Sequence, residues 1–538
     1  MYSPVPQRSF LTMVTSSSLL RSLFAACVVA QTAYARLVPS PENMDWFHAR
    51  SAERRVVFSD PTCSAIQAAI SNASAIYAPG TKQYTADIKH WCGSSDVYSK
   101  CTVQPANAAD VAAIIKVLGT SNSTFAVKGG GHSCAPGFSG AKGVTIAMTR
   151  FNEVSYNKSS GLVKYGSGLI WDDVYSGLEP YDVKVTGGRV SGVGVAGFSL
   201  GGGYSFLTNQ YGTTSDGIVA YDFITATGKI LYVTRKAYPD LFFLLQGGFN
   251  NAGIVTNFYA KARPRARVWG GVTFIDNKHL DTVLNLTAQF ASEQNTDLLG
   301  GLLPTLDAFG GVPGVECQVF YDDPAGPANG SFVKNIFDQL LALSGPAKNV
   351  RANRTMANFT QAAPSEAFEG VRGTFSSVSL ERLTPEILQT IKEEFKFYGS
   401  LAPLGAGALI SYDLEPFARA KSYPAASSTG WPHDKLLSPL NLYFAWPLGL
   451  SDGLFFDAIR KSTAKIRAAA IAQGQNLDGL YIYPNYALYD TPFEDVYGPN
   501  VARLTSIAAK YDPAKVMTRA GGFQFQRGRN TYGISSAP

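Results

Sequence analysis

The apolar positions between residues 107 and 127 first recur with the period of a helix and then form a continuous run. Four of them are spaced by three and four residues and share one helical face: Val111, Ile114, Ile115 and Leu118. Asn107 is a suitable N-cap and Gly119 a stop, so the pattern predicts a helix over 107–119. Phe125-Ala126-Val127 then predicts a short buried strand that leads into three glycines.

A second group of patterned segments lies between Val268 and Gly474. Runs of β-branched and aromatic residues predict four strands, at 268–275, 373–380, 408–414 and 442–446. Between them, Thr384-Pro385 begins a predicted helix with an apolar face formed by Ile387, Leu388, Ile391 and Phe395. These segments predict a second domain that contains both strands and helices.

Length and composition agree with two packed domains. Of the 538 residues, 46% are hydrophobic and 16% charged, which supplies two cores and excludes general disorder. Near the start, Arg8 and Arg21 precede the apolar run 23–30, and Ala33-Tyr34-Ala35 follows it. This order predicts a secretory signal peptide over 1–35. A membrane anchor is the alternative, but the run is shorter than the roughly 20 residues that span a bilayer.

Charge and glycosylation motifs fit a secreted protein. Loss of the two signal-peptide arginines lowers the net charge from +6 to +4, without a basic block. Nucleic acid and anionic membrane surfaces are therefore not expected as partners. Seven Asn-x-Ser/Thr triplets predict glycosylated surface positions: Asn72, Asn122, Asn157, Asn285, Asn329, Asn353 and Asn358.

Five cysteines remain after the predicted cleavage: Cys63, Cys92, Cys101, Cys134 and Cys317. Because this count is odd, at least one thiol is unpaired within the chain. Neither Cys-x-x-Cys nor paired histidines occur, so structural disulfides are favoured over a zinc site, and no metal is predicted. The spacing leaves the disulfide pairing open.

A glycine-rich stretch over 192–203 follows the triple glycine at 129–131. It contains the pattern G-x-G-x-x-G, and Asp216 lies at a suitable distance for a ribose contact. The run Gly201-Gly202-Gly203 is a poor start for the helix that a dinucleotide fingerprint opens, so a Rossmann domain is not expected. The two loops could instead bring backbone N–H groups against a pyrophosphate, and tight turns between strands are the equal alternative.

Three motifs together resemble the FAD-binding domain of the vanillyl-alcohol oxidase superfamily: KGGGHS at 128–133, GVGVAGFSLGGGYSFLTNQYG at 192–212 and YPDLFFLLQGGFNNAGIVTNF at 238–258. The stretch NVARLTSIAAKYDPAKV at 500–516 resembles the C-terminal segment of the berberine-bridge-enzyme-like branch, as found in secreted fungal oxidases. The resemblance implies an α+β fold with a two-part FAD-binding domain and a substrate domain built on a large antiparallel sheet flanked by helices. We expect the FAD-binding domain at 36–267, the substrate domain at 268–474, and a return to the FAD-binding domain at 475–538.

The resemblance also implies roles for individual residues. In this family the histidine after the glycines is bonded to the 8α carbon of FAD, which implies a covalent link at His132. Val190 stands where many relatives carry a second linking cysteine, so we expect a single link. Val193 aligns with the residue that governs oxygen access to the flavin in relatives, where valine is typical of oxidases. A core valine without this role is the equal alternative. The predicted cofactor-binding residues are Gly129, Gly130, Gly131, His132, Ser133, Val193, Gly194, Gly197, Gly201, Gly202, Gly203, Ile254 and Val255.

The stretch GLYIYPNYALYD at 479–490 matches a Tyr-x-Asn-Tyr pattern near the active site of the family. Oxidation of an alcohol or amine needs a base beside the C–H bond that gives hydride to the flavin, and a tyrosine serves only if its pKa of about 10 is lowered. Tyr483 and Tyr486 are candidate bases, and Asn485 is a candidate donor to flavin or substrate. Aromatic residues of the core are the alternative for both tyrosines.

The sequence thus predicts a secreted, monomeric FAD-linked oxidase that passes hydride to the flavin and electrons to O2, which yields H2O2. A small hydrophobic, secondary-metabolite-like substrate is expected because the second domain is rich in aromatic residues, among them Tyr412, Tyr443, Phe444 and Trp446. An oligosaccharide oxidase is the first alternative, although such enzymes usually carry the second link. A secreted protein that binds FAD without turnover is the other.

Overall fold

The structure is a computed structural model that describes residues 57–345, 348–363, 365–401, 407–417, 428–435 and 438–527. The predicted signal peptide lies outside the described residues. Among the helices of the described segments, none combines the length and the apolarity that crossing a bilayer requires. All seven asparagines of the predicted glycosylation motifs are exposed, as glycosylation would require.

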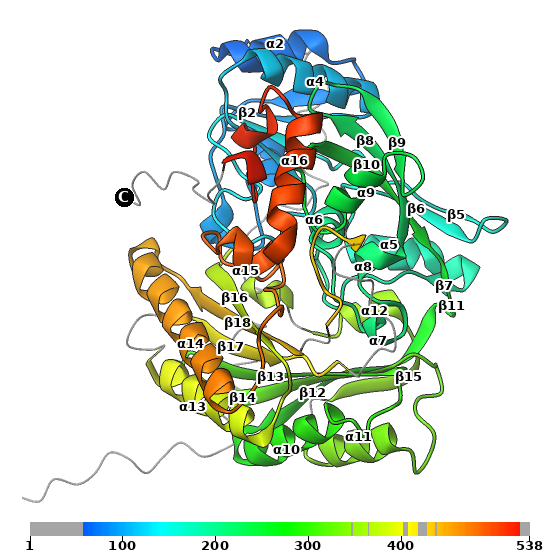
Figure 1. The fold of residues 1–538 in the computed structure, drawn as a ribbon, viewed down its shortest axis with the longest axis vertical. Helices are drawn as coiled ribbons and strands as arrows, with labels where there is room; N and C mark the ends of the chain where they lie inside the picture. Colours follow the sequence, from blue (N-terminus) through cyan, green and yellow to red (C-terminus); the bar gives the residue numbers. More distant parts are fainter. Residues whose placement is uncertain are drawn as a thin grey trace, which may run out of the picture. The chain divides into compact units, whose positions relative to one another are not determined.

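The first sheet has four strands in the order β1-β2-β4-β3 (Figure 1). Its strands are β1 (Ala75–Tyr77), β2 (Cys101–Gln104), β3 (Phe125–Lys128) and β4 (Val144–Ala147), and its helices are α2 (Pro61–Ala69), α3 (Lys82–Ile88) and α4 (Ala108–Thr120). The predicted helix at 107–119 is α4: the Asn107 side chain accepts from the backbone N–H of Asp110, and the four apolar positions are buried. The predicted strand is β3, whose last residue precedes the triple glycine.

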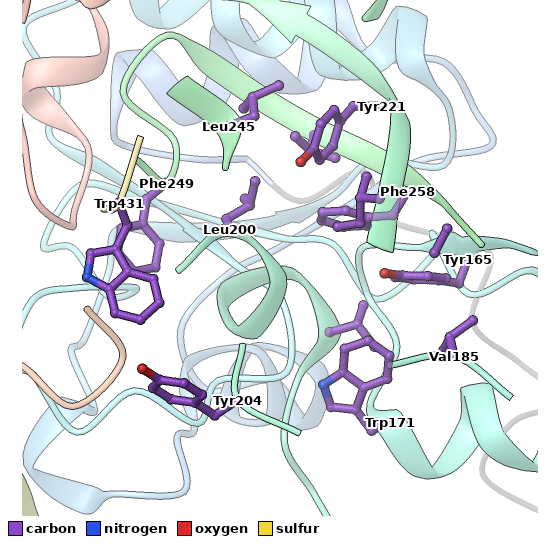
Figure 2. Close-up of a cluster of buried hydrophobic side chains, with 14 of the residues drawn as sticks. Tyr165, Trp171, Val185, Leu200, Tyr204, Tyr221, Leu245, Phe249, Phe258 and Trp431 are labelled. Carbon is purple, nitrogen blue, oxygen red and sulfur yellow. The ribbon is translucent and has the colours of Figure 1, made fainter. Parts of the chain in front are cut away.

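The second sheet is antiparallel, with five strands in the order β5-β6-β10-β8-β9. The strands are β5 (Val154–Asn157), β6 (Leu162–Gly166), β8 (Ile218–Thr225), β9 (Ile230–Thr234) and β10 (Gly253–Lys261). The connecting elements are α5 (Trp171–Leu178), β7 (Val183–Lys184), α6 (Val195–Leu200), α7 (Thr208–Tyr211), α8 (Thr214–Gly217), α9 (Pro239–Leu245) and β11 (Arg263–Pro264). A buried aromatic cluster fills the space beside this sheet, with Phe258 stacked on Tyr165 and Trp171 beside them (Figure 2).

The third sheet is antiparallel, with seven strands in the order β15-β12-β14-β13-β17-β18-β16. The strands are β12 (Arg267–Asp276), β13 (Gly300–Phe309), β14 (Val312–Tyr321), β15 (Asn349–Thr355), β16 (Arg372–Leu380), β17 (Leu409–Leu414) and β18 (Ser438–Trp446). The four strands predicted in this part correspond to β12, β16, β17 and β18. Four helices lie on one side of the sheet (Figure 1): α10 (Leu280–Phe290), α11 (Phe332–Ala342), α13 (Pro385–Leu401) and α14 (Asp452–Ala472). The helix predicted from residue 384 is α13.

Strand alternation gives this third sheet two different faces. Tyr412, Phe444 and Trp446 point toward the helices and join the large apolar cluster that fills the space between them. Tyr443 points to the opposite face, where it contacts Trp91. Three of the four aromatic residues from which we expected a hydrophobic substrate are therefore core residues, and that argument is wrong.

The last part of the chain contains α15 (Phe493–Tyr497) and α16 (Val501–Tyr511), and a short helix, α12 (Met356–Thr360), follows β15. The C-terminal segment is bonded to the chain near α9. Tyr511 donates to Asp240, at the start of α9, over 2.9 Å. Asn251 accepts from the N–H of Phe525 and donates to the carbonyl of Phe523. Residues 511–525 of the C-terminal segment thus contact the chain at the start of α9 and in the loop that follows it.

Candidate active site

The two glycine-rich loops meet backbone to backbone. A Cβ atom added to Gly130 would lie 2.4 Å from Cα of Gly194, and one added to Gly194 would lie 2.5 Å from the nitrogen of Gly130. Any side chain at either position would separate the loops, so glycine is required at both. We call this pair the glycine contact. Gly131 and Gly192 have positive φ angles, so turn geometry accounts for part of the glycine content as well.

The G-x-G-x-x-G pattern does begin a helix, contrary to our expectation. Gly194 is the N-cap of α6, which has six residues and ends at Gly201. The physical reason is that Val195, Phe198 and Leu200 contribute to the aromatic cluster, so tertiary packing supports a helix that glycine propensity disfavours. The exclusion of a Rossmann domain is nevertheless confirmed, because the next strand, β8, is antiparallel to both of its neighbours.

His132 follows the glycine contact and lies against Trp91. The two rings are stacked at 4.5 Å between centroids with planes 11° apart. The Nε2 atom of His132 is buried and has no hydrogen-bond partner. Burial lowers the pKa of His132 to about 4, so its imidazole is neutral at physiological pH. An orphaned neutral ring nitrogen beside a glycine loop fits a site that receives another group.

The disulfide pairing, which spacing left open, stabilises this corner. Cys92 is bonded to Cys134 and Cys63 to Cys101, and among the described residues Cys317 is free and buried. The Cys92–Cys134 bond joins the residue after Trp91 to the second residue after His132. The N–H of Trp91 also donates to the carbonyl of Gly131 over 3.0 Å. Trp91 and His132 are thus held together by ring stacking, a backbone hydrogen bond and a covalent bridge.

The Tyr-x-Asn-Tyr motif lies against the second glycine loop. A Cβ on Gly201 would lie 2.3 Å from Oδ1 of Asn485, so this glycine lets the amide approach the backbone. The amide nitrogen of Asn485 donates to the hydroxyl oxygen of Tyr483 over 2.8 Å. Trp431 and Tyr483 similarly approach Gly202. The structure therefore brings together Gly201, Gly202, Tyr483 and Asn485 from segments far apart in the chain.

A buried ionic group that the sequence did not reveal includes the third residue of this motif. Arg189 forms a bidentate ion pair with Glu415 over 2.8 and 2.9 Å, and it donates to the hydroxyl oxygen of Tyr486 over 2.7 Å. The Tyr486 hydroxyl in turn donates to Oε1 of Glu415 over 2.7 Å. The only signal in the sequence is an arginine inside a glycine-rich loop, at TGGRVSG. We call Arg189, Glu415 and Tyr486 the ionic triad.

The pKa shifts in this group differ from those that a tyrosine base requires. Burial raises the pKa of Tyr483 to about 12, and burial together with Glu415 raises that of Tyr486 well above its usual value. Although burial itself opposes the charge on Arg189, Glu415 and Tyr486 keep the pKa of the guanidinium above its usual value. A proton taken up at the Tyr486 oxygen can pass to Glu415, so the carboxylate is the better final acceptor.

Arg189 and Glu415 of the triad border a small pocket. Its lining combines the ion pair with the apolar side chains of Phe206, Leu302, Pro416 and Phe417. Arg189 also lies over the rings of Phe206 and Phe417, 5.9 Å from each centroid. Charged and aromatic groups therefore meet at one end of the third sheet.

The remaining predicted cofactor residues are spread over several environments. Ile254 and Val255 are buried in different apolar clusters on the two faces of β10. Val193 is half-buried, and its carbonyl oxygen accepts a hydrogen bond from the N–H of Trp171. Gly197 is exposed and has open space beside it. Ser133 accepts from the N–H of Ala135, and a side chain on Gly203 would collide with Phe198. Gly129 abuts the carbonyl of Ser167, whose hydroxyl is buried without a partner.

The residues around the glycine contact suit an FAD. Lys128 is buried at the end of β3 with its side chain against Gly131, which places a cation beside the loop for a pyrophosphate. Burial lowers the pKa of Lys128, and an anion would offset that cost. The unpartnered atoms of His132 and Ser167 are further groups that a ligand could satisfy. In the described segments no cluster of His, Cys, Asp and Glu could hold a metal ion.

Comparison with known proteins agrees with this arrangement. Residues 99–234 match the FAD binding domain family. The FAD-dependent monooxygenase drtC of Aspergillus calidoustus is 27% identical over 479 residues, which cover 84% of this chain and 88% of that protein. An uncharacterized FAD-linked oxidoreductase of Arthroderma benhamiae is 35% identical over 232 residues, or 42% of this chain and 46% of the relative.

Solved structures share the fold. Physcomitrella patens BBE-like 1 superposes with a TM-score of 0.70 at 19% identity, over 85% of this chain and 97% of that one. The glucooligosaccharide oxidase of Acremonium strictum, whose structure reveals a novel flavinylation, gives 0.70 at 18% identity over the same shares. The chain thus contains an FAD binding domain over residues 99–234. It also shares its fold with these two solved structures, a BBE-like protein and a glucooligosaccharide oxidase, in agreement with the resemblance seen in its motifs.

Proposed function

We propose that this protein is a secreted oxidase that removes hydride and a proton from a small-molecule substrate and transfers the electrons to O2, which yields H2O2. FAD, when bound, supplies the hydride acceptor. His132 would hold it by a single covalent link at the 8α carbon, with Lys128 and the glycine contact at the pyrophosphate. The observation that carries the proposal is the neutral, unpartnered Nε2 of His132 directly beside the glycine contact.

The ionic triad supports the acid–base part of the proposal. The Tyr486 oxygen would receive the substrate proton while its own proton moves to Oε1 of Glu415, along a hydrogen bond of 2.7 Å. Arg189 stays bonded to both partners and keeps them in place. Asn485 holds Tyr483 against the second glycine loop, where the pair would border the substrate.

Secretion is part of the proposal because two disulfides occur in the described chain. Disulfides persist mainly in oxidising compartments. The predicted signal peptide and the exposed glycosylation motifs point the same way.

A monooxygenase is the second candidate, because the drtC relative carries that name. The two reactions differ in the fate of dioxygen. An oxidase releases one H2O2 for each product molecule, whereas a monooxygenase places an oxygen atom in the product. Product mass and peroxide yield therefore separate them. An oligosaccharide oxidase differs only in substrate, and a carbohydrate panel tests it.

Two measurements test the proposal as a whole. Anaerobic substrate should bleach the flavin absorbance and air should restore it; a flavin that no alcohol, amine or sugar bleaches would favour the non-catalytic alternative. For the link, the acid-precipitated parent protein should be yellow, whereas His132→Ala should release its flavin to the supernatant. A colourless parent pellet contradicts the covalent link.

A further inference from the structure

The face of the third sheet that points away from its helices carries a continuous polar surface. Antiparallel register places Thr305 on β13 opposite Glu316 on β14 and Asp413 on β17. Asp307 lies opposite Ser411, and Asp413 lies opposite Asn441 on β18. Cross-strand partners share a face, so these side chains are neighbours. We call Asp307, Glu316 and Asp413, with Thr305, Gln318, Ser411 and Asn441, the acidic face.

The three carboxyl groups of the acidic face have no cationic partner. Within the described segments, no lysine, arginine or histidine forms an ion pair with any of them. Their bonds are to neutral groups: Ser411 and Asn441 donate to Asp413 over 2.7 Å each, and Gln318 donates to Glu316 over 3.4 Å. Burial, reinforced by Glu316 and Asp413, raises the pKa of Asp307, and burial raises that of Glu316 to about 7. Clustered carboxylates without a counter-ion destabilise a folded protein, so a function is required to explain them.

A second observation indicates what this surface lacks. Asn441 is only 3% exposed, and its Oδ1 atom has no hydrogen-bond partner although its amide nitrogen is bonded to Asp413. A buried acceptor without a donor costs about 1–3 kcal/mol. The acidic face therefore presents an unsatisfied acceptor as well as three carboxyl groups without a cationic partner. A group with several N–H donors and a positive charge satisfies both needs, whereas a neutral polyol supplies donors only.

The acidic face is continuous with the ionic triad. Glu415 lies two residues beyond Asp413, and its charge helps to raise the pKa of Asp413, which burial raises most. Glu415 directly follows the end of β17, and residues two apart in extended chain have Cα atoms about 7 Å apart. A ligand bound at Asp413 can therefore reach the Tyr486 hydroxyl with a carbon about that distance from its cationic end.

We propose that the acidic face binds the ammonium group of a basic substrate, while the carbon to be oxidised lies at the ionic triad. The ammonium is a recognition group at a distance of about 7 Å from the reacting carbon rather than the group that reacts. This inference rests on the proposed oxidase function, and it replaces the hydrophobic substrate that the sequence led us to expect. It names the substrate class as alcohols or amines that carry a second, protonated nitrogen.

Three benzyl alcohols that differ only at the para position test the inference: 4-(aminomethyl)benzyl alcohol, 4-methylbenzyl alcohol and 4-(hydroxymethyl)benzoate. Calorimetry on the intact flavoprotein, kept anaerobic with its flavin already reduced, measures binding without turnover. We expect the ammonium compound to bind at least about tenfold more tightly than the neutral one, and the carboxylate to bind most weakly. Binding should also release protons, since a cation lowers the raised carboxyl pKa values, which two buffers of different ionisation enthalpy would reveal.

The isosteric double variant Glu316→Gln/Asp413→Asn should reduce the preference for the ammonium compound to near unity while the neutral compound binds as before. Asp457→Asn, an exposed carboxylate on α14, is the matched control and should keep the preference. Equal binding of the ammonium and neutral compounds to the parent, a preference that survives the double variant, or no binding of the ammonium compound at millimolar concentration each overturns the inference. Binding without anaerobic bleaching would instead count against the oxidase function alone.

Discussion

At the scale of single residues, the ionic triad shows how a tyrosine can serve in proton transfer without a low pKa. Tyr486 accepts a hydrogen bond from Arg189 and donates one to Glu415. These two bonds fix the orientation of its O–H bond, which points to the carboxylate. Burial and the adjacent carboxylate raise the pKa of Tyr486, which excludes a stable tyrosinate. In the proposed mechanism the tyrosine therefore acts as a relay, and the negative charge stays on the carboxylate.

Glu415→Gln and Tyr486→Phe should each lower kcat by roughly 100-fold, because general-base catalysis contributes 10²–10⁴-fold. The double variant should lose no more than the worse single variant, since the two residues act as one unit. Stopped-flow measurement of anaerobic flavin reduction checks this. Tyr165→Phe, which removes a buried hydroxyl with no partner, is the control and should leave the rate unchanged. Additive losses in the double variant would contradict the relay.

Trp91 is the residue that fixes the orientation of His132. Trp91→Ala removes the stacked ring, and we expect the covalently held fraction of flavin to fall severalfold, since the imidazole gains rotational freedom. Trp91→Phe retains an aromatic plane and should restore most of the link. Flavin fluorescence in denaturing gels measures the covalent fraction independently of activity. An unchanged fraction in Trp91→Ala, at parental thermal stability, would exclude this positioning role.

At the scale of elements, strand alternation gives the third sheet an apolar face that packs against helices and an opposite face that we propose binds the substrate. One face packs aromatic and aliphatic residues against α10, α11, α13 and α14, whereas the other carries the acidic face. The sheet is stable because its helix-covered face buries a large apolar area. That burial offsets the cost of the unpaired carboxyl groups on the opposite face.

Glu316 should make the stability of the ligand-free protein depend on pH. Its pKa is raised to about 7 in the folded state, so the folded protein binds the proton more tightly than the unfolded chain does. The part of the free energy of unfolding that comes from protonated Glu316 is therefore fully present below the ordinary glutamate pKa of about 4.3. It is lost as pH rises through 7. Glu316→Gln should be more stable than the parent at pH 8, by on the order of 1 kcal/mol, and the difference should vanish below about pH 4. Urea unfolding at both pH values tests this, with exposed Glu366→Gln as control. An equal difference at both pH values would contradict it.

At the scale of the whole molecule, residues far apart in the chain complete one site. The glycine loops and His132 come from the first half, Glu415 from β17 and its continuation, and the two tyrosines from the segment before α15. Trp431, between β17 and β18, covers Gly202 and contacts Tyr483. It also contacts Tyr204, which lies beside it in Figure 2. The site therefore exists only when the parts of the chain on both sides are folded together.

Asn251 connects the C-terminal segment to the loop after α9 through three hydrogen bonds. Its side chain donates to the carbonyls of Gly248 and Phe523 and accepts from the N–H of Phe525. Asn251→Ala should lower the free energy of unfolding by about 1–3 kcal/mol, because buried backbone groups lose their partners. Asn250→Ala, which removes the neighbouring amide but none of these bonds, should cost less. Thermal unfolding of both variants tests this, and equal losses would show that the bonds are not the cause.

The sequence by itself determined the helix at 107–119, the four strands of the second domain, the glycine loops and the position of His132, since each depends on local spacing or on a short motif. The disulfide pairing, the ionic triad and the acidic face required the tertiary structure. Arg189, Glu415 and Tyr486 meet across separations of 226 and 71 residues, which local periodicity cannot report. Both faces of β18 are buried, so alternation alone does not show which face points to the helices. Only the register of its neighbours and the packing of α13 and α14 decide that the aromatic residues belong to the core and the carboxylates to the site.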